Sequence, residues 1–312
     1  MNILVTGASG FIGNALVQRL IQHGHHVRAV IHQKPPSLLD CQVNYIVADI
    51  TDPSTLTTAV KDVDVVFHCA ALVHDYGSTK KILETNIQGT KNLAAACGDN
   101  IKRFVFLSHL PTNSIKNLDA YSYSKAIAEQ YLLEKFHNTR FPVVIIRPGN
   151  VYGPGATTWV LRPLHAIQQG RIALINNGTG IFLHTYIDNL VDALLSTLHA
   201  PNAVGETIEI TDGEPMITWA RYLNDLAEIA NKPPITKNMG KNTALFLSTL
   251  MMIRYALFHT APLLTPTAVR IFTNQRTVSL DKARTILGYT PSVEYTKGME
   301  QTKKWLTTEH YL

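Results

Sequence analysis

The feature that most constrains this fold is a series of short apolar runs, up to about residue 150, separated by longer helical patterns. The runs, rich in β-branched residues, are Ile3–Thr6, Val27–Ile31, Tyr45–Ala48, Val63–His68, Arg103–Ser108 and Val143–Arg147. Continuous runs of this kind are typical of parallel strands buried on both faces. The helical patterns between them provide the crossover connections that parallel strands require. We predict an α/β fold with an open, doubly wound parallel sheet.

Three glycines follow the first run and open a helical pattern, with the spacing GxxGxxG. A glycine triplet alone also occurs in ordinary strand–helix turns, but the order strand, turn, helix favours a site for a dinucleotide pyrophosphate. The first glycine permits a tight turn, the second lets the phosphates approach the backbone, and the third lets helix and strand pack closely. The residues expected to contact the cofactor are Gly7, Ser9, Gly10, Phe11, Ile12 and Gly13.

The turn after the second run bears on the choice between NADP and NAD. An acid there usually holds the ribose 2′-hydroxyl of NAD, but this chain has no Asp or Glu before Asp40. His32 and Lys34 follow the run instead, with Arg28 nearby, and such groups suit a 2′-phosphate. We therefore favour NADP and keep NAD as the other candidate. The alternative for His32 and Lys34 is an exposed loop without ligand contact.

Two further strand ends are expected to contact the cofactor. Asp49 and Ile50 follow the third run and can receive the adenine amino group, although Asp49 can also serve as a helix cap. Ala70 and Ala71 follow the fourth run at the carboxyl edge of the sheet, where small residues let a ribose lie against the backbone. We interpret His68 as a hydrogen-bonded core residue.

The second half of the chain has a different sequence pattern. Loops rich in Gly and Pro interrupt it, although residues 189–199 and 207–211 still resemble one more helix and strand of the sheet. Helical patterns split by prolines dominate the last third, which predicts a smaller, mostly helical C-terminal lobe that binds substrate. The predicted division is 1–170 with 186–212 for the dinucleotide-binding domain, and 171–185 with 213–312 for the substrate lobe.

Composition narrows the classes of partner. The chain has 312 residues, is 46% hydrophobic and carries a net charge of +5 without a dense basic block, so nucleic-acid binding is not expected. Three separated cysteines, Cys41, Cys69 and Cys97, predict neither disulfides nor a metal site and fit a reducing cytoplasm. We find no signal-peptide pattern, and the uncharged part of the apolar stretch 243–259 is too short to span a membrane.

Tyr121 and Lys125 stand one helical turn apart, in a pattern that Asp119 and Ala120 begin. We expect the ammonium to lower the pKa of Tyr121 from its ordinary value of about 10. Such a phenol exchanges a proton with a substrate hydroxyl while hydride moves to or from nicotinamide, and Lys125 also holds the cofactor ribose. The alternative is a solvated helix face, because the YxxxK spacing is common by chance.

Several other motifs accompany the glycine turn and the YxxxK pair. They are FHCAA at 67–71, TNIQGT at 85–90, RPGNVYGP at 147–154, YIDN at 186–189, LDKA at 280–283 and LGYTP at 287–291, with Trp305 after them. Together they resemble the extended short-chain dehydrogenase/reductase superfamily, of the NAD-dependent epimerase/dehydratase type, over nearly the whole chain. The resemblance implies a Rossmann-type fold, Tyr121 as acid/base, Lys125 as its partner, and cofactor contacts at Pro148 and Val151.

The resemblance also implies a catalytic hydroxyl near the end of the Arg103–Ser108 run, and here the chain departs from the pattern. The family usually has consecutive hydroxyl residues, whereas this chain has Ser108, His109 and Leu110. The usual hydroxyl aligns with His109. Either Ser108 takes the role, which we favour, or His109 donates a hydrogen bond to the substrate oxygen, or catalysis is weak or altered. Thr112 is the next candidate hydroxyl.

Relatives that act on nucleotide sugars typically bind the pyrophosphate with an arginine just before the tyrosine of the YIDN segment. Phe182 occupies that position here, and an apolar side chain cannot bind phosphate as a cation does. Asn150 matches a position that contacts the sugar nucleotide in those enzymes, and Arg162 or Arg171 could replace the arginine. We expect Asn150, Phe182 and Tyr186 to contact the substrate.

Residues 177–189 and 261–270 resemble the hydroxysteroid and sterol dehydrogenase branch more closely. In those relatives the stretch corresponding to 246–257 lines an apolar substrate entrance or touches a membrane, and here it is rich in Leu, Met and Phe. The alternative is one more helix packed on the main domain.

These observations favour an NAD(P)-dependent oxidoreductase acting on the secondary alcohol or ketone of a bulky, steroid- or lipid-like substrate. The alternatives are an NAD-dependent nucleotide-sugar epimerase or dehydratase, and a dinucleotide-binding regulatory protein with little turnover. We expect a small-molecule substrate and a cytoplasmic location. Peripheral membrane contact and a homodimer paired through the helix that carries Tyr121 remain open options.

Overall fold

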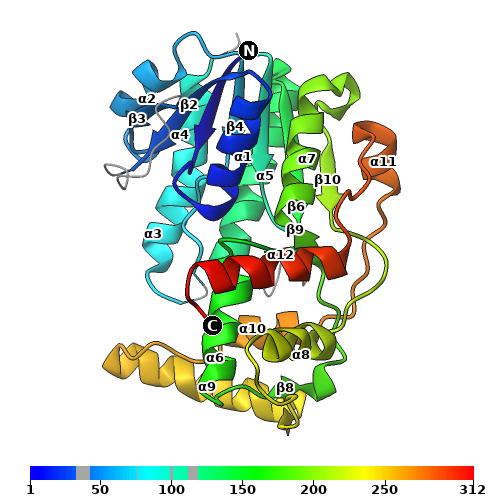
Figure 1. Ribbon diagram of the computed structural model, residues 1–312. Helices are drawn as coiled ribbons and strands as arrows, with labels where there is room; N and C mark the ends of the chain where they lie inside the picture. Colours follow the sequence, from blue (N-terminus) through cyan, green and yellow to red (C-terminus); the bar gives the residue numbers. More distant parts are fainter. Residues whose placement is uncertain (33–42, 75, 99–100, 112–118) are drawn as a thin grey trace.

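A seven-stranded sheet forms the upper part of the molecule in Figure 1. The computed structural model describes residues 1–32, 43–74, 76–98, 101–111 and 119–312. The strands lie in the order β3-β2-β1-β4-β5-β6-β10, and every neighbouring pair is parallel. They are β1 (Asn2–Thr6), β2 (His26–Ile31), β3 (Asn44–Val47), β4 (Val65–His68), β5 (Arg103–Leu107), β6 (Val143–Pro148) and β10 (Thr207–Ile210). The predicted doubly wound parallel sheet is confirmed.

The sheet is buried on both faces because alternate side chains of each strand enter two separate cores. Ile3 and Val5 of β1 pack with residues of α1 (Phe11–Gln22) and α7 (Ile187–Ser196), whereas Leu4 enters the opposite core. The helices of that second core are α2 (Pro53–Val60), α4 (Gly89–Ala96) and α5 (Ala120–Thr139). A strand with two buried faces has no polar side, which is why these runs are continuously apolar.

A smaller group of elements lies beyond the carboxyl ends of the strands, at the bottom of Figure 1. Its helices are α6 (Arg162–Gln168), α8 (Trp219–Ile229), α9 (Lys241–Phe258) and α10 (Pro266–Phe272). Two pairs of short strands accompany them, β7 (Asn150–Tyr152) with β9 (His184–Tyr186), and β8 (Leu174–Ile175) with β11 (Asn238–Met239).

Three further helices complete the chain. Helix α3 (Thr79–Leu83) continues through a π-helical turn at Glu84–Gln88 into α4, and α11 (Asp281–Leu287) packs against β10. Helix α12 (Tyr295–Thr308) crosses between the sheet and the smaller group (Figure 1). The return of β10 to the sheet matches the expected helix–strand unit, while the assignment of the smaller group to substrate binding stays a prediction.

The turn between β1 and α1 leaves no room for a side chain at Gly13. A Cβ there would lie 2.2 Å from the Gly7 carbonyl oxygen, so we expect Gly13→Ala to lower the free energy of unfolding by about 1–3 kcal/mol. Urea unfolding measures this. Gly240→Ala is the control, because a Cβ there meets open space, and its cost should stay below about 1 kcal/mol. Equal stability of Gly13→Ala and the wild type would contradict the close packing.

Candidate active site

The glycine turn has the geometry that a pyrophosphate site requires. Gly7 adopts a φ of +67°, and a Cβ on it would lie 2.7 Å from the backbone nitrogen of Ala70. Helix α1 begins after Gly10 without a capping side chain from the described residues and without an acidic residue in its first turn. No side chain of the described residues therefore caps the first N–H groups of α1, beside Ser9, Phe11 and Ile12, and a bound phosphate would satisfy them.

The end of β2 differs from the expected cationic pocket. Arg28 donates to the carbonyls of Ala59 (2.7 Å) and Lys61 (2.6 Å) at the end of α2, so its guanidinium is already engaged and its nearness to a 2′-phosphate stays a prediction. The side chain of His32 is 71% exposed, and its Nδ1 lies 3.6 Å from Asp49 Oδ2. Lys34 lies outside the described residues.

Asp49 is held in a turn at the end of β3. Its Oδ1 accepts hydrogen bonds from the backbone nitrogen and the hydroxyl of Thr51, both at 2.8 Å. The cap of α2 is Asp52 instead, which accepts from the backbone nitrogen of Ser54. Ile50 is buried, so only its backbone could meet an adenine. The contact of Asp49 with adenine stays a prediction.

At the end of β4, His68 is fully buried and hydrogen-bonded, as interpreted from the sequence. Its ring nitrogens pair with the hydroxyls of Thr6 (2.7 Å) and Thr90 (2.9 Å), and burial lowers its pKa to about 3. The backbone nitrogen of Ala70 donates to the Thr6 hydroxyl at 3.2 Å. Ala70 and Ala71 are half-buried, and Ala70 lies beside Gly7 at the carboxyl edge of the sheet.

Helix α5 brings the YxxxK pair to the end of β5. Lys125 is buried, and its Nζ donates to the carbonyl of Leu107 at 2.7 Å. Burial lowers the pKa of Lys125 to about 8. Burial, together with the nearby charge of Asp119, raises the pKa of Tyr121. The predicted lowering of the Tyr121 pKa is therefore wrong for this arrangement, in which the ammonium is directed to a backbone carbonyl.

The departure from the family pattern also lies at the end of β5. The Ser108 hydroxyl is buried and has no hydrogen-bond partner among the described residues. The neighbouring His109 ring lies against the Tyr121 ring, with 5.2 Å between centroids, and its Nε2 is hydrogen-bonded to Ser122 Oγ at 3.0 Å. Both candidates therefore lie at the N-terminal end of α5, whereas Thr112 lies outside the described residues.

Two polar connections to α5 were not predicted from the sequence. Asn86, in the TNIQGT motif, bonds both backbone groups of Leu72 and donates to the Ser124 hydroxyl at 2.9 Å. This bond joins the segment after β4 to the helix that carries Tyr121. The motif itself was visible, but the partner of Asn86 is distant in sequence.

The second connection is a chain of charged groups. Glu129, one turn after Lys125, accepts two hydrogen bonds from Arg147 on β6. Glu209 on β10 lies 3.8 Å from Arg147 and accepts two hydrogen bonds from Arg276. Arg276 also donates to the carbonyl of Pro111 at 2.8 Å. This charged chain links α5, β6 and β10 to the segment that follows Ser108.

Two of the predicted substrate residues lie in the core. Phe182 is fully buried and stacks on Tyr222 at 3.9 Å between centroids, and buried Tyr186 donates its hydroxyl to Gln301. These contacts place both rings in the core, although Phe182 also lines the cavity described below, and the contact of either residue with substrate stays a prediction. Asn150 is half-buried, as the first residue of β7. Pro148 and Val151, on either side of it, are buried at the end of β6 and in β7.

A cavity of about 460 Å³ lies beyond the carboxyl ends of β6 and β10. It is lined by residues 181–184, at the start of β9, and by parts of the segments 211–217 and 277–284. Tyr121, Lys125 and Ser108 are not among its lining residues.

Comparison with known proteins shows the family of this chain. The family model described as "NAD dependent epimerase/dehydratase family" matches residues 3–211. The chain belongs to this family. A 2-alkyl-3-oxoalkanoate reductase of Stenotrophomonas maltophilia is 32% identical over 97% of this chain and 98% of that protein. A 3-beta-hydroxysteroid dehydrogenase of Mycolicibacterium neoaurum is 27% identical over 98% of this chain and 91% of its own length.

The fold of the epimerase/dehydratase family is shared with solved structures. The UDP-glucuronic acid 4-epimerase of Bacillus cereus, in complex with NAD, has a TM-score of 0.76 at 24% identity, covering 99% of this chain and all of that one. The resemblance to the extended short-chain dehydrogenase/reductase superfamily is therefore confirmed, and the chain is an oxidoreductase of that superfamily. In the described part of the chain no helix combines the length and hydropathy of a membrane-spanning segment.

Burial of Lys125 predicts a stability difference that depends on pH. Because its pKa falls to about 8 in the folded state, against about 10.4 unfolded, the unfolded state binds more protons between these values. The free energy of unfolding of the wild type, relative to Lys125→Met, should therefore rise by about 2 kcal/mol from pH 8 to pH 10. Chemical unfolding at several pH values measures it. Lys303→Met, at an exposed position, should show no such trend, and a flat difference for Lys125→Met would contradict the burial of its charge.

Proposed function

We propose that this protein is an NAD(P)-dependent oxidoreductase that interconverts a ketone and a secondary alcohol on a bulky, apolar, lipid-like substrate. The observation that carries the proposal is the buried hydroxyl of Ser108, which has no partner in the part of the chain that the structure describes, at the strand end to which Lys125 is hydrogen-bonded. A hydroxyl in this position needs an acceptor, and a substrate carbonyl oxygen is one. The names of the two relatives, a 3-oxoalkanoate reductase and a hydroxysteroid dehydrogenase, support the same chemistry.

In the proposed mechanism, each side chain has one task. Tyr121 gives its phenolic proton to the substrate oxygen during reduction, and Ser108 donates a hydrogen bond to the same oxygen. Lys125 stabilises the phenolate that remains and would donate to the ribose hydroxyls of the cofactor. The residues that would hold the dinucleotide are Gly7 to Gly13 at α1, and when bound it supplies the hydride. In the oxidation direction Tyr121 takes the proton back.

The preference for NADP is part of the proposal. It is supported by the absence of an acid directly after β2 in the described residues, where His32 is exposed. With Arg28 engaged by α2, the remaining cationic candidates are His32 and Lys34. The ratio of kcat/KM with NADPH and NADH tests this, and a ratio below one would assign NAD.

Replacing Tyr121 tests the proposed proton donor. We expect Tyr121→Phe to lower kcat for ketone reduction by about 100-fold or more, while NADPH still binds with its ordinary fluorescence change. The measurement is NADPH oxidation with a panel of long-chain and cyclic ketones. Tyr123→Phe is the matched control, since Tyr123 lies on the same helix and is exposed, and it should keep full activity.

The same assay separates the alternatives. Stoichiometric NADPH consumption supports a reductase, whereas conversion of a nucleotide sugar without net absorbance change would establish the epimerase alternative. Binding of NADPH without turnover of any panel member would favour the regulatory alternative. Unchanged turnover in Tyr121→Phe would remove Tyr121 from the mechanism.

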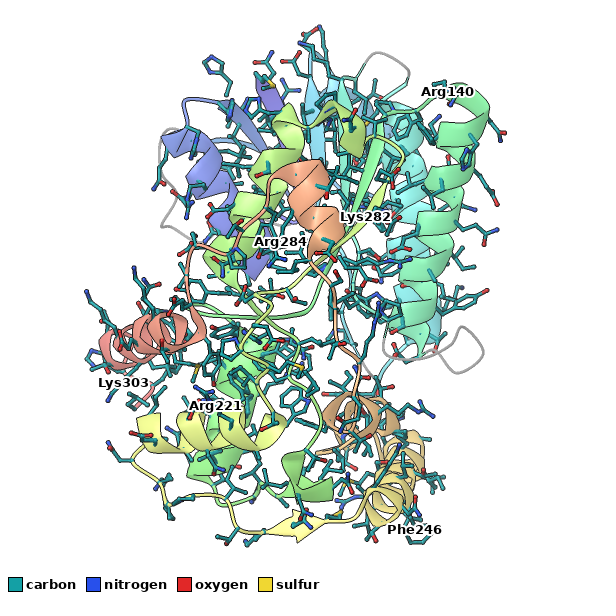
Figure 2. All side chains as sticks on the ribbon, turned by 90° about the vertical axis from the view of Figure 1, so that its right-hand side faces the viewer. Arg140, Arg221, Phe246, Lys282, Arg284 and Lys303 are labelled. Atoms are coloured by element: carbon teal, nitrogen blue, oxygen red, sulfur yellow. The ribbon has the colours of Figure 1, made fainter. Side chains whose placement is uncertain are left out.

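We also propose that α9 contacts a membrane surface. Its inner face, with Ala244 and Ser248, is buried, while Phe246, Leu250, Ile253 and Leu257 form a stripe on the outer face and are 46–68% exposed. Figure 2 labels Phe246 at the end of the molecule farthest from the sheet. A helix that is apolar on both faces but packed on only one leaves an unpartnered surface.

The charge of the chain around this stripe favours an anionic lipid surface as its binding partner. Residues 229–280 contain six Lys and Arg and neither Asp nor Glu, and Lys241 and Arg254 lie on α9 itself. The ring of Tyr255 on the inner face meets that of Tyr76, with 5.3 Å between centroids, so α9 reaches the segment after β4. A lipid-like substrate could therefore enter close to the membrane contact.

A charge placed in the stripe should abolish this binding. We expect Leu250→Glu to weaken binding to phosphatidylglycerol vesicles about tenfold or more, because it adds a negative charge and removes apolar contact area. Vesicle flotation measures it, with Met216→Glu as the control at a similarly exposed position elsewhere. Equal binding of Leu250→Glu and the wild type would overturn the proposal. If Leu250→Glu kept vesicle binding and instead lost a homodimer, the stripe would be a dimer interface, which would also overturn it.

A homodimer is proposed through α4 and α5. The outward surface of these helices carries aromatic side chains: Tyr123 is exposed, and Lys91 lies over the Tyr131 ring at 5.3 Å from its centroid. Sedimentation of the wild type and of Tyr123→Glu tests this pairing. We expect the wild type to be a dimer and Tyr123→Glu to be a monomer.

A further inference from the structure

Beside Ser108, a chain of three hydrogen-bonded side chains begins at the N-terminus of α5. Asp119 caps the helix and accepts from the backbone nitrogen of Ser122 at 3.0 Å and from its hydroxyl at 2.9 Å. The hydroxyl oxygen of Ser122 is in turn 3.0 Å from Nε2 of His109. The other ring nitrogen of His109, Nδ1, is buried and has no partner in the described ranges.

Counting protons along this chain fixes the form of the imidazole. A carboxylate only accepts hydrogen bonds, so the single proton of the Ser122 hydroxyl is given to Asp119. The Ser122 oxygen can then only accept from His109, which places the imidazole proton on Nε2. Burial, with the nearby charge of Lys125, lowers the pKa of His109 to about 4, so the ring is neutral near pH 7. Nδ1 therefore presents a lone pair.

We propose that His109 is a specificity-determining residue whose Nδ1 accepts a hydrogen bond from a substrate hydroxyl group on the second carbon from the reacting carbonyl carbon. This inference rests on the proposed ketone reduction and names the class of ketone, a β-hydroxy ketone. The reacting carbonyl oxygen accepts from Ser108 and Tyr121, and the β-hydroxyl of the substrate donates to His109, whose ring lies against that of Tyr121. Asp119 and Ser122 are positioning residues, because they act through the imidazole.

The lone pair on Nδ1 argues against two other ways in which His109 could contact a substrate. In this form His109 cannot donate to a carbonyl oxygen, which leaves the Ser108 hydroxyl for that role. A carboxylate placed beside Nδ1 would meet a second acceptor, so a 3-oxo acid should bind there less well than a neutral hydroxyl compound. An unpaired buried acceptor is costly, and a substrate hydroxyl removes that cost.

The first test is spectroscopic and does not depend on turnover. Long-range proton–nitrogen correlation spectra of the ¹⁵N-histidine-labelled protein with bound NADP⁺ should show His109 protonated on Nε2 and bare on Nδ1 near pH 7. Adding a β-hydroxy derivative of dodecyl methyl ketone should shift the Nδ1 resonance, whereas the plain ketone should leave it in place. Protonation on Nδ1, or equal responses to the two ketones, would overturn the proposal.

The second test is kinetic and uses the same two ketones with NADPH. His109→Leu should lower kcat/KM for the β-hydroxy ketone about 10- to 100-fold and that for the plain ketone less than about threefold. Ser122→Ala, which removes the acceptor for Nε2, should show both imidazole forms in the spectrum and lose part of this selectivity. An equal loss for both ketones in His109→Leu would overturn the proposal. Failure of the wild type to reduce either ketone would count against the proposed function, while the spectrum would still decide the form of His109.

Discussion

The hydrogen bond from Lys125 to the carbonyl of Leu107 joins the two parts of the structure on which the site depends. Lys125 lies on α5, one turn after Tyr121, and Leu107 ends β5, just before Ser108. A buried ammonium is costly unless it is hydrogen-bonded, so this contact fixes the position of α5 against the sheet. The phenol, the ammonium and the Ser108 hydroxyl are thereby held at one strand end.

Other contacts hold the same junction from three sides. Asn86 joins α5 to the segment after β4, and the charged chain from Glu129 to Arg276 joins it to β6, β10 and Pro111. Such redundancy suits a site in which a displacement of about 1 Å lowers the rate strongly. In the proposed function, the hydroxyls of Ser108 and Tyr121 donate hydrogen bonds to the substrate at this junction, whereas Nδ1 of His109 accepts one from it.

The sequence predicted those features that depend on local pattern. Runs such as Ile3–Thr6 are apolar at every position because both faces of β1 are buried, and the glycine spacing follows from close contacts within one turn. Features that depend on tertiary partners were predicted poorly. Arg28 donates to the end of α2, and Phe182 enters an aromatic cluster that its neighbours in sequence do not reveal. The pKa of Tyr121 rises because the phenol is buried and lies near the charge of Asp119, while the Lys125 ammonium is directed to the Leu107 carbonyl.

The central claim is that the Tyr121 hydroxyl and the Ser108 hydroxyl converge on one substrate oxygen beside the nicotinamide. A crystal structure of the protein with NADP⁺ and a bound long-chain secondary alcohol tests this claim most directly. We expect the alcohol oxygen to lie within hydrogen-bond distance of both hydroxyls, with its carbon facing the nicotinamide ring. An alcohol oxygen bound away from Tyr121, or a Tyr121 side chain turned out of the cofactor site, would contradict it.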